Sequence, residues 1–227
     1  MKTFVISLGG SIIFPSNRGP DSAFLKRFRK LILSEANKGN RFVIITGGGF
    51  VNRLYNEALG RIIRTDDETL DLLGIAATRM NAFFVKSMFQ ERAYGDVMEN
   101  PTKKIKTDKR IIIGCGWKPG CSSDKDAVLA ARTFRAKKII NLTNIDYVYT
   151  KDPRKHKDAR KIGKMMWKDF RKIVGDRWSP KLNAPFDPMA AKLAEKLKLK
   201  VVIAKGNDLD NLKRILQGKA FRGTTIG

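Results

Sequence analysis

Short apolar runs alternate with amphipathic segments along most of this chain. β-branched and other apolar residues cluster in runs that end at glycine or at polar residues, a pattern typical of buried strands. Between the runs, apolar residues recur every three or four positions, as in Phe24, Phe28 and Leu31, which indicates helices that bury one face. The pattern predicts strands at 3–8, 42–46, 111–113, 138–142, 200–204 and 224–226, and helices at 23–36, from 51, 68–90, 126–135, 187–197 and 208–217.

This alternation of strands and helices predicts an α/β fold, with a mainly parallel central sheet and helices on both of its faces. Residues 151–164 are rich in charge, and we expect them to form a surface loop. Neither a repeat nor a convincing linker interrupts the sequence. We therefore treat 1–227 as a single domain with two lobes.

Composition excludes several classes of protein. No stretch approaches the roughly 20 apolar residues that a membrane helix needs, and the apolar run at the N-terminus is cut short by Gly9 and Gly10. We expect a cytoplasmic protein. Two cysteines, Cys115 and Cys121, and one histidine, His156, are too few for a disulfide framework or a zinc site.

The net charge of +24 raises the question of a nucleic-acid partner. The basic residues are spread widely, however, and are densest at 103–110 and 154–164. No RNA-recognition signature, zinc finger or helix-turn-helix pattern accompanies them. We therefore do not expect nucleic acid as a partner, whereas an anionic substrate would benefit from the positive field.

Three glycine-bearing turns follow predicted strands: SLGGS at 7–11, TGGGF at 46–50 and GCGWKPGCSS at 114–123. Glycine lets the backbone approach a ligand closely, and exposed amides before a helix can cradle an anion. In parallel sheets, ligands bind beyond the carboxyl ends of the strands. Each turn could be merely a tight connection, but three together predict a site for several phosphates.

Other nucleotide and hydrolase motifs do not fit. The chain has no G-x-x-x-x-G-K-[ST] and no G-x-G-x-x-G that opens a helix, which argues against a P-loop enzyme and a dinucleotide fold. With His156 as its only histidine, inside the charged segment, a Ser-His-Asp hydrolase is excluded.

The order of longer motifs matches a known family. SLGGSIIFP, VIITGGGFVNRLY, LDLLGIAATRMNA, GWKPGCSSDKDAV, INLTNIDYVYTKDPRK, FDPMAAKLAEKLKLKVVI and a terminal GTTI follow one another nearly end to end. The chain thereby resembles the amino acid kinase superfamily, and within it the archaeal-type uridylate kinases. The resemblance implies an αβα sandwich that acts as a hexamer, with ATP and Mg²⁺, and that phosphorylates uridine monophosphate (UMP) to UDP.

By position, the resemblance also implies roles for individual residues. For ATP binding it points to Gly10, Ser11, Gly49, Arg53, Thr143, Asn144, Tyr149 and Asp152. For catalysis it points to Gly10 and Ser11, to Asp146 as the acid that organises catalytic lysines, and to Lys192 as a cation for the transferring phosphoryl group. For UMP it points to Gly48, to Asp71 against the ribose, and to the loop Trp117, Lys118, Pro119, Gly120, Cys121, Ser122 and Ser123.

Simpler interpretations stay open for some of these residues. Asp71 could be surface charge or a helix cap, Tyr149 a core residue, Asp152 a turn residue before Pro153, and Lys192 a solvated lysine.

The sequence departs from the family pattern at three places. Ser7 occupies the position of a superfamily lysine that archaeal-type uridylate kinases also lack, and Lys192, Arg53 or Lys118 could replace that charge. Two residues are inserted near Asp124 and Asp126, so either aspartate could hold the family role. Tyr147 replaces a glycine and could narrow the ATP pocket.

Three alternative functions remain. Another superfamily phosphotransferase, such as an isopentenyl phosphate kinase, would use a histidine near the acceptor, and His156 is far from the acceptor motifs. A non-catalytic nucleotide-binding or storage protein of the same fold is the second alternative, and a nucleic-acid-binding protein is the third.

Overall fold

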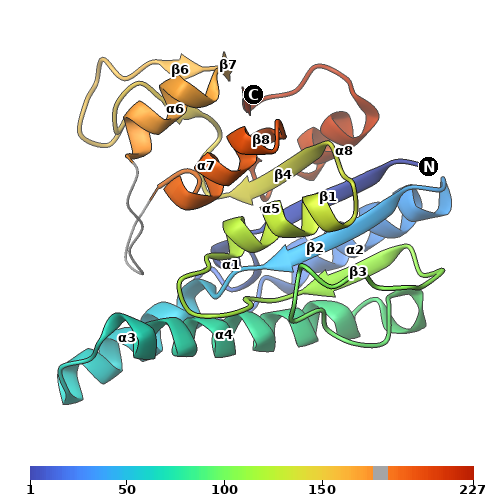
Figure 1. Cartoon of the computed structure of the whole chain (residues 1–227), viewed down its shortest axis with the longest axis horizontal. Coiled ribbons are helices and arrows are strands. Elements are labelled where there is room, and N and C mark those ends of the chain that lie inside the picture. Colours follow the sequence, from blue (N-terminus) through green and yellow to red (C-terminus); the bar gives the residue numbers. More distant parts are fainter. Residues whose placement is uncertain (176–183) are drawn as a thin grey trace.

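A mostly parallel, seven-stranded sheet runs through the computed structural model, which describes residues 1–175 and 184–227 (Figure 1). The strand order is β3-β2-β1-β4-β8-β9-β7, and only the pairing of β8 with β9 is antiparallel. The strands are β1 (Thr3–Leu8), β2 (Arg41–Thr46), β3 (Ile111–Gly114), β4 (Lys138–Thr143), β7 (Lys164–Met165), β8 (Lys200–Lys205) and β9 (Thr224–Ile226). A separate small hairpin pairs β5 (Val148–Tyr149) with β6 (Lys161–Ile162).

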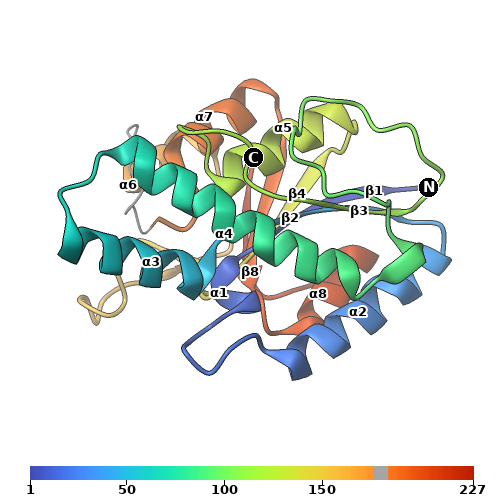
Figure 2. The same cartoon turned by 90° about the horizontal axis from the view of Figure 1, so that it is seen from below.

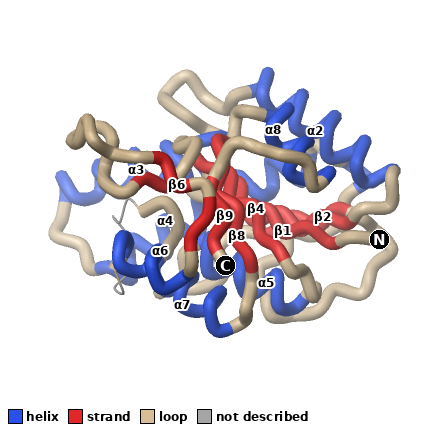
Figure 3. The backbone as a smooth tube through the Cα atoms, turned by 90° about the horizontal axis from the view of Figure 1, so that it is seen from above, coloured by secondary structure: helices blue, strands red, loops and turns tan. Residues whose placement is uncertain are grey.

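Helices cover both faces of the sheet, as Figure 3 shows from above. They are α1 (Gly10–Ile13), α2 (Ser22–Asn37), α3 (Gly49–Ile62), α4 (Asp67–Ser87), the 3-10 turn η1 (Gln90–Arg92), α5 (Ser123–Thr133), α6 (Trp167–Val174), α7 (Pro188–Lys196) and α8 (Leu209–Gln217). The side chains of a strand alternate between the two faces. Ile6 and Ile44 accordingly pack in the core under α2 and α8, whereas Val5 and Val43 pack under α5 and α7.

This architecture confirms the predicted α/β fold with a mainly parallel sheet. Each predicted strand and helix is present, with ends that differ by a few residues. The expectation of a surface loop at 151–164 is wrong at the end of this segment, where β6 forms and β7 begins. In addition, the structure has a helix, α6, that the sequence pattern did not predict. Only Trp167 and Phe170 of α6 are buried, so its apolar stripe is too short to stand out in a charged segment.

Polar caps fix where several helices begin. The side chains of Asp21, Asp66, Ser122, Asp187 and Asp208 each accept a hydrogen bond from a backbone amide in the first turn of α2, α4, α5, α7 and α8, respectively. Such a cap satisfies an amide that has no partner within the helix. Two of these caps, Ser122 and Asp187, lie beside the site described next.

The carboxyl ends of four neighbouring strands lie level with one another. Leu8 of β1 pairs with Thr46 of β2 and with Leu142 of β4, and Ile45 of β2 pairs with Gly114 of β3. The chain therefore leaves β1, β2, β3 and β4 at one edge of the sheet. The strand order reverses at β1, between β2 and β4, and ligands of open parallel sheets bind at such a point.

Candidate functional site

The first two glycine turns interlock, backbone against backbone. A Cβ atom on Gly10 would overlap the backbone of Gly47 and Gly49, and one on Gly47 would lie 2.6 Å from the nitrogen of Gly10. Gly49 adds a positive φ of 68°, which side chains disfavour. These three glycines are therefore required by the contact between the turns, and the contact joins the ends of β1 and β2.

The polar side chains of α4 hold the second and third glycine turns in place. The buried amide of Asn81 donates from Nδ2 to the carbonyls of Gly47 and Gly48, at 2.7 and 3.1 Å. Thr78 accepts a hydrogen bond at Oγ1 from the amide of Gly116 at 2.8 Å. Because one helix contacts both turns, their positions are coupled.

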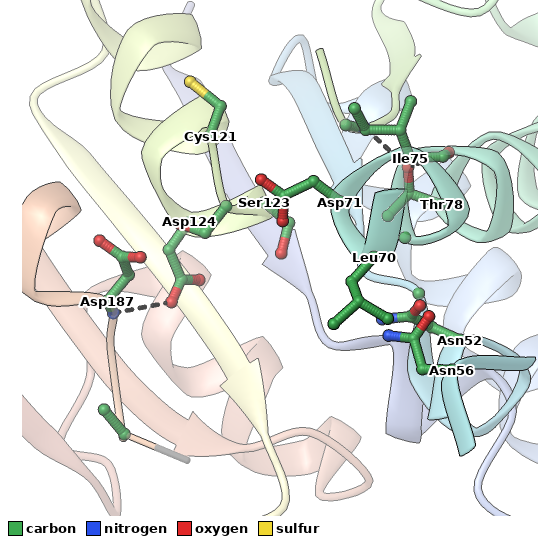
Figure 4. Close-up of a pocket in the computed structure, with 15 residues that line it drawn as sticks. Asn52, Asn56, Leu70, Asp71, Ile75, Thr78, Cys121, Ser123, Asp124 and Asp187 are labelled. Atoms are coloured by element: carbon green, nitrogen blue, oxygen red, sulfur yellow. Dashed lines mark hydrogen bonds between the residues drawn. The ribbon is translucent and has the colours of Figure 1, made fainter. Parts of the chain in front are cut away.

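A cleft of about 260 Å³ opens between α3 and α4 on one side and the starts of α5 and α7 on the other (Figure 4). It is lined by Gly48, Asn52, Asn56, Leu70, Asp71, Gly74, Ile75, Thr78, Gly116, Cys121, Ser122, Ser123, Asp124, Ala184 and Asp187. Among these described residues there are three carboxylates and no lysine, arginine or histidine. Cations for an anionic ligand must come from the rim.

Asp124 ties three elements together at one wall of the cleft. Its Oδ1 accepts a hydrogen bond from the hydroxyl of Ser7 on β1, and its Oδ2 accepts one from the amide of Asp187, which caps α7, each at 3.0 Å. Figure 4 shows the Asp187 contact. Desolvation raises the pKa of Asp124 to about 6, against the effect of these two donors. Ser7 thus anchors a carboxylate at the position where the superfamily has a lysine.

Asp126, two residues further along α5, does not border the cleft. Its side chain is fully buried; Oδ2 accepts a hydrogen bond from the amide of Trp117, and Oδ1 has no partner among the described residues. Burial raises the pKa of Asp126 to about 7 and also raises the pKa of Asp187. Of the two aspartates that the sequence left open, only Asp124 faces the cleft.

The expected UMP residues fall into two groups. Gly48, Asp71, Cys121, Ser122 and Ser123 line the cleft. Trp117, Lys118, Pro119 and Gly120 form the adjoining loop outside its lining, with the ammonium of Lys118 4.3 Å from the centre of the Trp117 ring. Asp71 joins the two groups, because its Oδ2 accepts a hydrogen bond from the amide of Gly120 at 2.7 Å.

The expected adenosine residues lie beyond the neighbouring end of β4. The carbonyl of Leu142 accepts a hydrogen bond from Gly9, so the first glycine turn adjoins Thr143 and Asn144. Tyr149 is the second residue of β5 in the small hairpin, and the carboxylate of Asp152 pairs with the guanidinium of Arg154 at 3.0 Å. Asp152 also accepts hydrogen bonds from backbone amides of the next residues, as a turn residue does.

Among the described residues, the side chain of Asp146 contacts Tyr149 and Lys161. Although burial acts in the opposite direction, hydrogen bonds from Tyr149 and Lys161 hold the pKa of Asp146 below its usual value. The cation in contact with Asp146 is thus Lys161, and not Lys192. Lys192 is exposed on α7 and is outside the lining of the cleft.

Arg53 and Ser11 flank the interlocked turns. Arg53 is exposed on α3, with its guanidinium carbon 5.9 Å from the centre of the Phe50 ring. Ser11 lies in the short helix α1, directly after Gly10. Both residues are thus near the junction of the turns, outside the lining of the cleft.

Five polar residues in or beside the cleft escaped sequence reasoning: Asn52, Asn56, Thr78 and Asp187 line it, and Asn81 holds the second glycine turn. Thr78 and Asn81 are polar residues on the otherwise apolar face of α4, and this is the signal that could have singled them out. Asn52 and Asn56 are one helical turn apart in a helix with an exposed surface, where such residues are common.

Comparisons with known proteins agree with one another. A model of the amino acid kinase family matches residues 2–205. The uridylate kinase of Sulfurisphaera tokodaii is 34% identical over an alignment of 195 positions that covers 84% of this chain and 86% of that protein. The uridylate kinase of Thermoplasma volcanium is 33% identical over an alignment of 229 positions that covers 99% of this chain and 97% of that protein.

Solved structures show the same likeness. The crystal structure of uridylate kinase from Archaeoglobus fulgidus superposes with a TM-score of 0.83 and 32% identity, covering 100% of both chains. The UMP kinase of Bacillus anthracis has a TM-score of 0.78, at 20% identity, over 100% of this chain and 96% of that one. The second likeness concerns the fold alone.

Proposed function

Because this chain belongs to the amino acid kinase family, we propose that it transfers the γ-phosphoryl group of ATP to UMP, giving ADP and UDP. In this reaction an oxygen of the UMP phosphate forms a bond to the γ-phosphorus. The bond from that phosphorus to the oxygen bridging to the β-phosphate breaks, and ADP leaves. Since a phosphate monoester is already largely ionised at neutral pH, the acceptor needs no general base.

The observation that carries the proposal is the interlocking of the two glycine turns beside the cleft. The contact of Gly10 with Gly47 and Gly49 fixes the distance between the end of β1 and the start of α3. Phosphoryl transfer depends mainly on aligning two phosphates and neutralising their charge. A rigid junction between a donor turn and an acceptor turn supplies that alignment.

We assign the cleft to UMP. Gly48, at the start of α3, would meet the phosphate, and the oxygen of Asp71 that is not bonded to Gly120 would accept a hydrogen bond from the ribose. Cys121, Ser122 and Ser123 would contact the rest of the nucleotide, with residues 117–120 as the outer part of the same loop. The bond between Asp71 and Gly120 keeps this loop against α4.

We assign the adjoining edge of the sheet to ATP. Gly10, Ser11, Gly49 and Arg53 would meet its phosphates. The adenosine would lie over the end of β4, against Thr143, Asn144 and Tyr149. For the adenosine to contact Asp152, the salt bridge between Asp152 and Arg154 must break.

Asp124 is our choice for the carboxylate nearest the point of transfer, since Asp126 is buried behind the Trp117 amide. The cleft needs cations, and we propose that the exposed side chains of Lys192 and Arg53 turn toward its rim. Lys192 is therefore proposed to meet the transferring phosphoryl group. Asp146, held by Lys161, would act on the ATP side instead of in direct contact with Lys192.

Mg²⁺ fits this site as a companion of ATP. The described residues contain no group of three or more His, Cys, Asp or Glu side chains that could hold a metal ion. Mg²⁺ is usually bound through one or two carboxylates together with substrate phosphates, and Asp124 could supply such a carboxylate. When bound, the ion would neutralise charge on the phosphates.

We further propose that the protein forms a homo-oligomer, a hexamer by the resemblance described above. Leu72, Met80, Phe83 and Phe84 of α4 are exposed to between 42% and 70%. A second copy of the chain is the occupant we propose for this apolar face.

No described helix is long and apolar enough to cross a membrane. The single-domain organisation and the cytoplasmic location stay predictions.

A coupled assay of ADP release tests the proposed reaction. UMP, CMP, dUMP and isopentenyl phosphate are supplied in parallel, with ATP and Mg²⁺. We expect the highest kcat/KM with UMP. Turnover with isopentenyl phosphate but not with UMP would contradict the proposal, and binding of nucleotides without any ADP release would favour a storage protein.

Replacing Lys192 by alanine tests the proposed catalytic cation. We expect kcat to fall by about 100-fold or more, because removal of one donor to a transition-state charge typically has this effect. Lys196→Ala, one turn further along α7 and also exposed, is the matched control. Unchanged kcat in Lys192→Ala, with the fold intact by circular dichroism, would remove Lys192 from the mechanism.

A further inference from the structure

Two asparagines of α3 line the cleft, each with a carbonyl oxygen that has no hydrogen-bond partner in the described part of the chain. Asn52 and Asn56 are four residues apart and therefore lie on the same face of the helix, one above the other (Figure 4). Each of these carbonyl oxygens is buried. A buried carbonyl without a donor is unfavourable by about 1–3 kcal/mol, so the pair is poorly explained by folding alone.

Within the described part of the protein, two glycines adjoin the side chain of Asn52. A Cβ atom on Gly48 would lie 2.8 Å from the Cβ of Asn52, and one on Gly74 would lie 3.5 Å from its Nδ2. The amide thus lies flat against the backbone of α4, where Gly74 makes room for it. Leu70, which lines the same cleft, has no polar group in its side chain.

The position of the pair matches the middle of a nucleotide. Gly48, Asn52 and Asn56 are spaced four residues apart, about 6 Å for each step along a helix. If the acceptor phosphate lies at Gly48, the sugar follows roughly one turn further, beside Asn52. Asp71, assigned to the ribose, lines the same cleft from α4, and one of its oxygens is already bonded to Gly120.

We propose that Asn52 and Asn56 hydrogen-bond the 2′-hydroxyl of the acceptor's ribose and thereby select ribonucleotides over deoxyribonucleotides. A hydroxyl both donates and accepts, so it pairs with an amide whichever of its two ends faces the cleft. A missing 2′-hydroxyl would leave a buried amide unpaired, which discriminates strongly against the deoxy substrate. This inference rests on the proposed transfer to UMP.

Asn52→Leu and Asn56→Leu test the inference, because leucine has a similar size but cannot hydrogen-bond. For each variant, kcat/KM is measured with UMP and with dUMP. We expect the value for UMP to fall by about five- to tenfold per asparagine, the worth of one hydrogen bond, and the value for dUMP to change less than about twofold. Glu57→Gln, on the exposed side of α3, is the control and should change neither value.

The result that matters is the ratio of the two kcat/KM values. A ratio that stays as in the wild type, or a wild type that uses UMP and dUMP equally well, would overturn the inference while leaving the kinase function intact. A wild type that does not phosphorylate UMP at all would instead overturn the proposed function, and the ribose assignment with it. Isothermal titration of the Asn52→Leu variant with UMP and dUMP shows whether a loss arises in binding.

Discussion

Asn81 is the residue whose contacts bear most directly on the shape of the second glycine turn. It donates to the carbonyls of Gly47 and Gly48 from a fully enclosed position. We expect Asn81→Asp to lower kcat with UMP by about tenfold or more, since the carboxylate lacks the donor and repels both carbonyls. Steady-state kinetics of ADP release check this expectation.

Ser87→Ala on the exposed side of the same helix is the control for Asn81. The loss in Asn81→Asp should appear in kcat with both ATP and UMP saturating, because the turn adjoins both proposed subsites. A variant with wild-type kcat and only a lower melting temperature would limit Asn81 to a structural role.

Asp126 makes stability depend on pH. Its pKa is raised from 3.8 to about 7 by burial, so the folded protein holds this proton more tightly than the unfolded chain does. The free energy of unfolding therefore decreases as the pH rises from about 4 to about 7. Asp126→Asn removes this titration, and we expect its stability relative to the wild type to increase by roughly 3–4 kcal/mol between pH 4 and pH 8.

Urea unfolding of the two proteins at several pH values measures this difference. Asp124 and Asp187 also have raised pKa values, but they are present in both proteins and cancel in the comparison. Asp96→Asn changes an exposed carboxylate and should show no such trend. A pH-independent difference between wild type and Asp126→Asn would mean that Asp126 is ionised throughout.

At the scale of elements, α4 serves three purposes with three faces. Thr78 and Asn81 hold the glycine turns, and Ala82 and Val85 pack in the core under β1 and β2. The remaining face carries the exposed apolar residues. In Figure 2, the helix α4 runs along the outside of the molecule. A helix that is apolar on its solvent side as well as its core side is typical of a buried interface.

Replacing Met80 and Phe83 of α4 by glutamate tests self-association. Met80 is 70% and Phe83 62% exposed, so the charges should not disturb the fold of one chain. We expect the double variant to have the mass of a smaller assembly by light scattering, because two charges would be buried at the interface. Replacing exposed Lys213 of α8 by glutamate should leave the mass unchanged. A monomeric wild type would contradict the proposed oligomer.

The elements that the sequence predicted well are those with strong periodicity. The buried runs of β1, β2 and β4 and the stripe of α2 are specified by local pattern, and the structure has them in place. The apolar stripe of α6 has only two buried residues, Trp167 and Phe170. The hairpin of β5 with β6 depends on tertiary contacts, such as the hydrogen bond that the Val148 amide donates to the hydroxyl of Thr224. Such contacts leave no periodic signal in the sequence.

At the scale of the whole molecule, the convergence of the glycine turns followed from topology. Parallel strands that end in glycine turns must present them at one edge, and they do. The interlocking of Gly10 with Gly49 could not be predicted, because it depends on the exact separation of β1 and β2. Likewise, which of Asp124 and Asp126 faces the cleft depends on the orientation of α5 about its own axis, and no local pattern in the sequence gives that orientation.

The net charge of +24 contrasts with a cleft whose described lining has three carboxylates and no cation. The positive field of the molecule would therefore concentrate anionic UMP and ATP at a site that is not itself cationic.

Because screening shortens from about 30 Å at 0.01 M salt to about 8 Å at 0.15 M, we expect kcat/KM for UMP to fall about three- to tenfold over this range, with kcat nearly unchanged. Steady-state kinetics in KCl measure both. A kcat/KM that stays constant over this range of salt would mean that the positive charge does not contribute to catalysis. Salt-dependent retention on RNA that persists with saturating ATP and UMP would instead mean that the charge binds a polyanion.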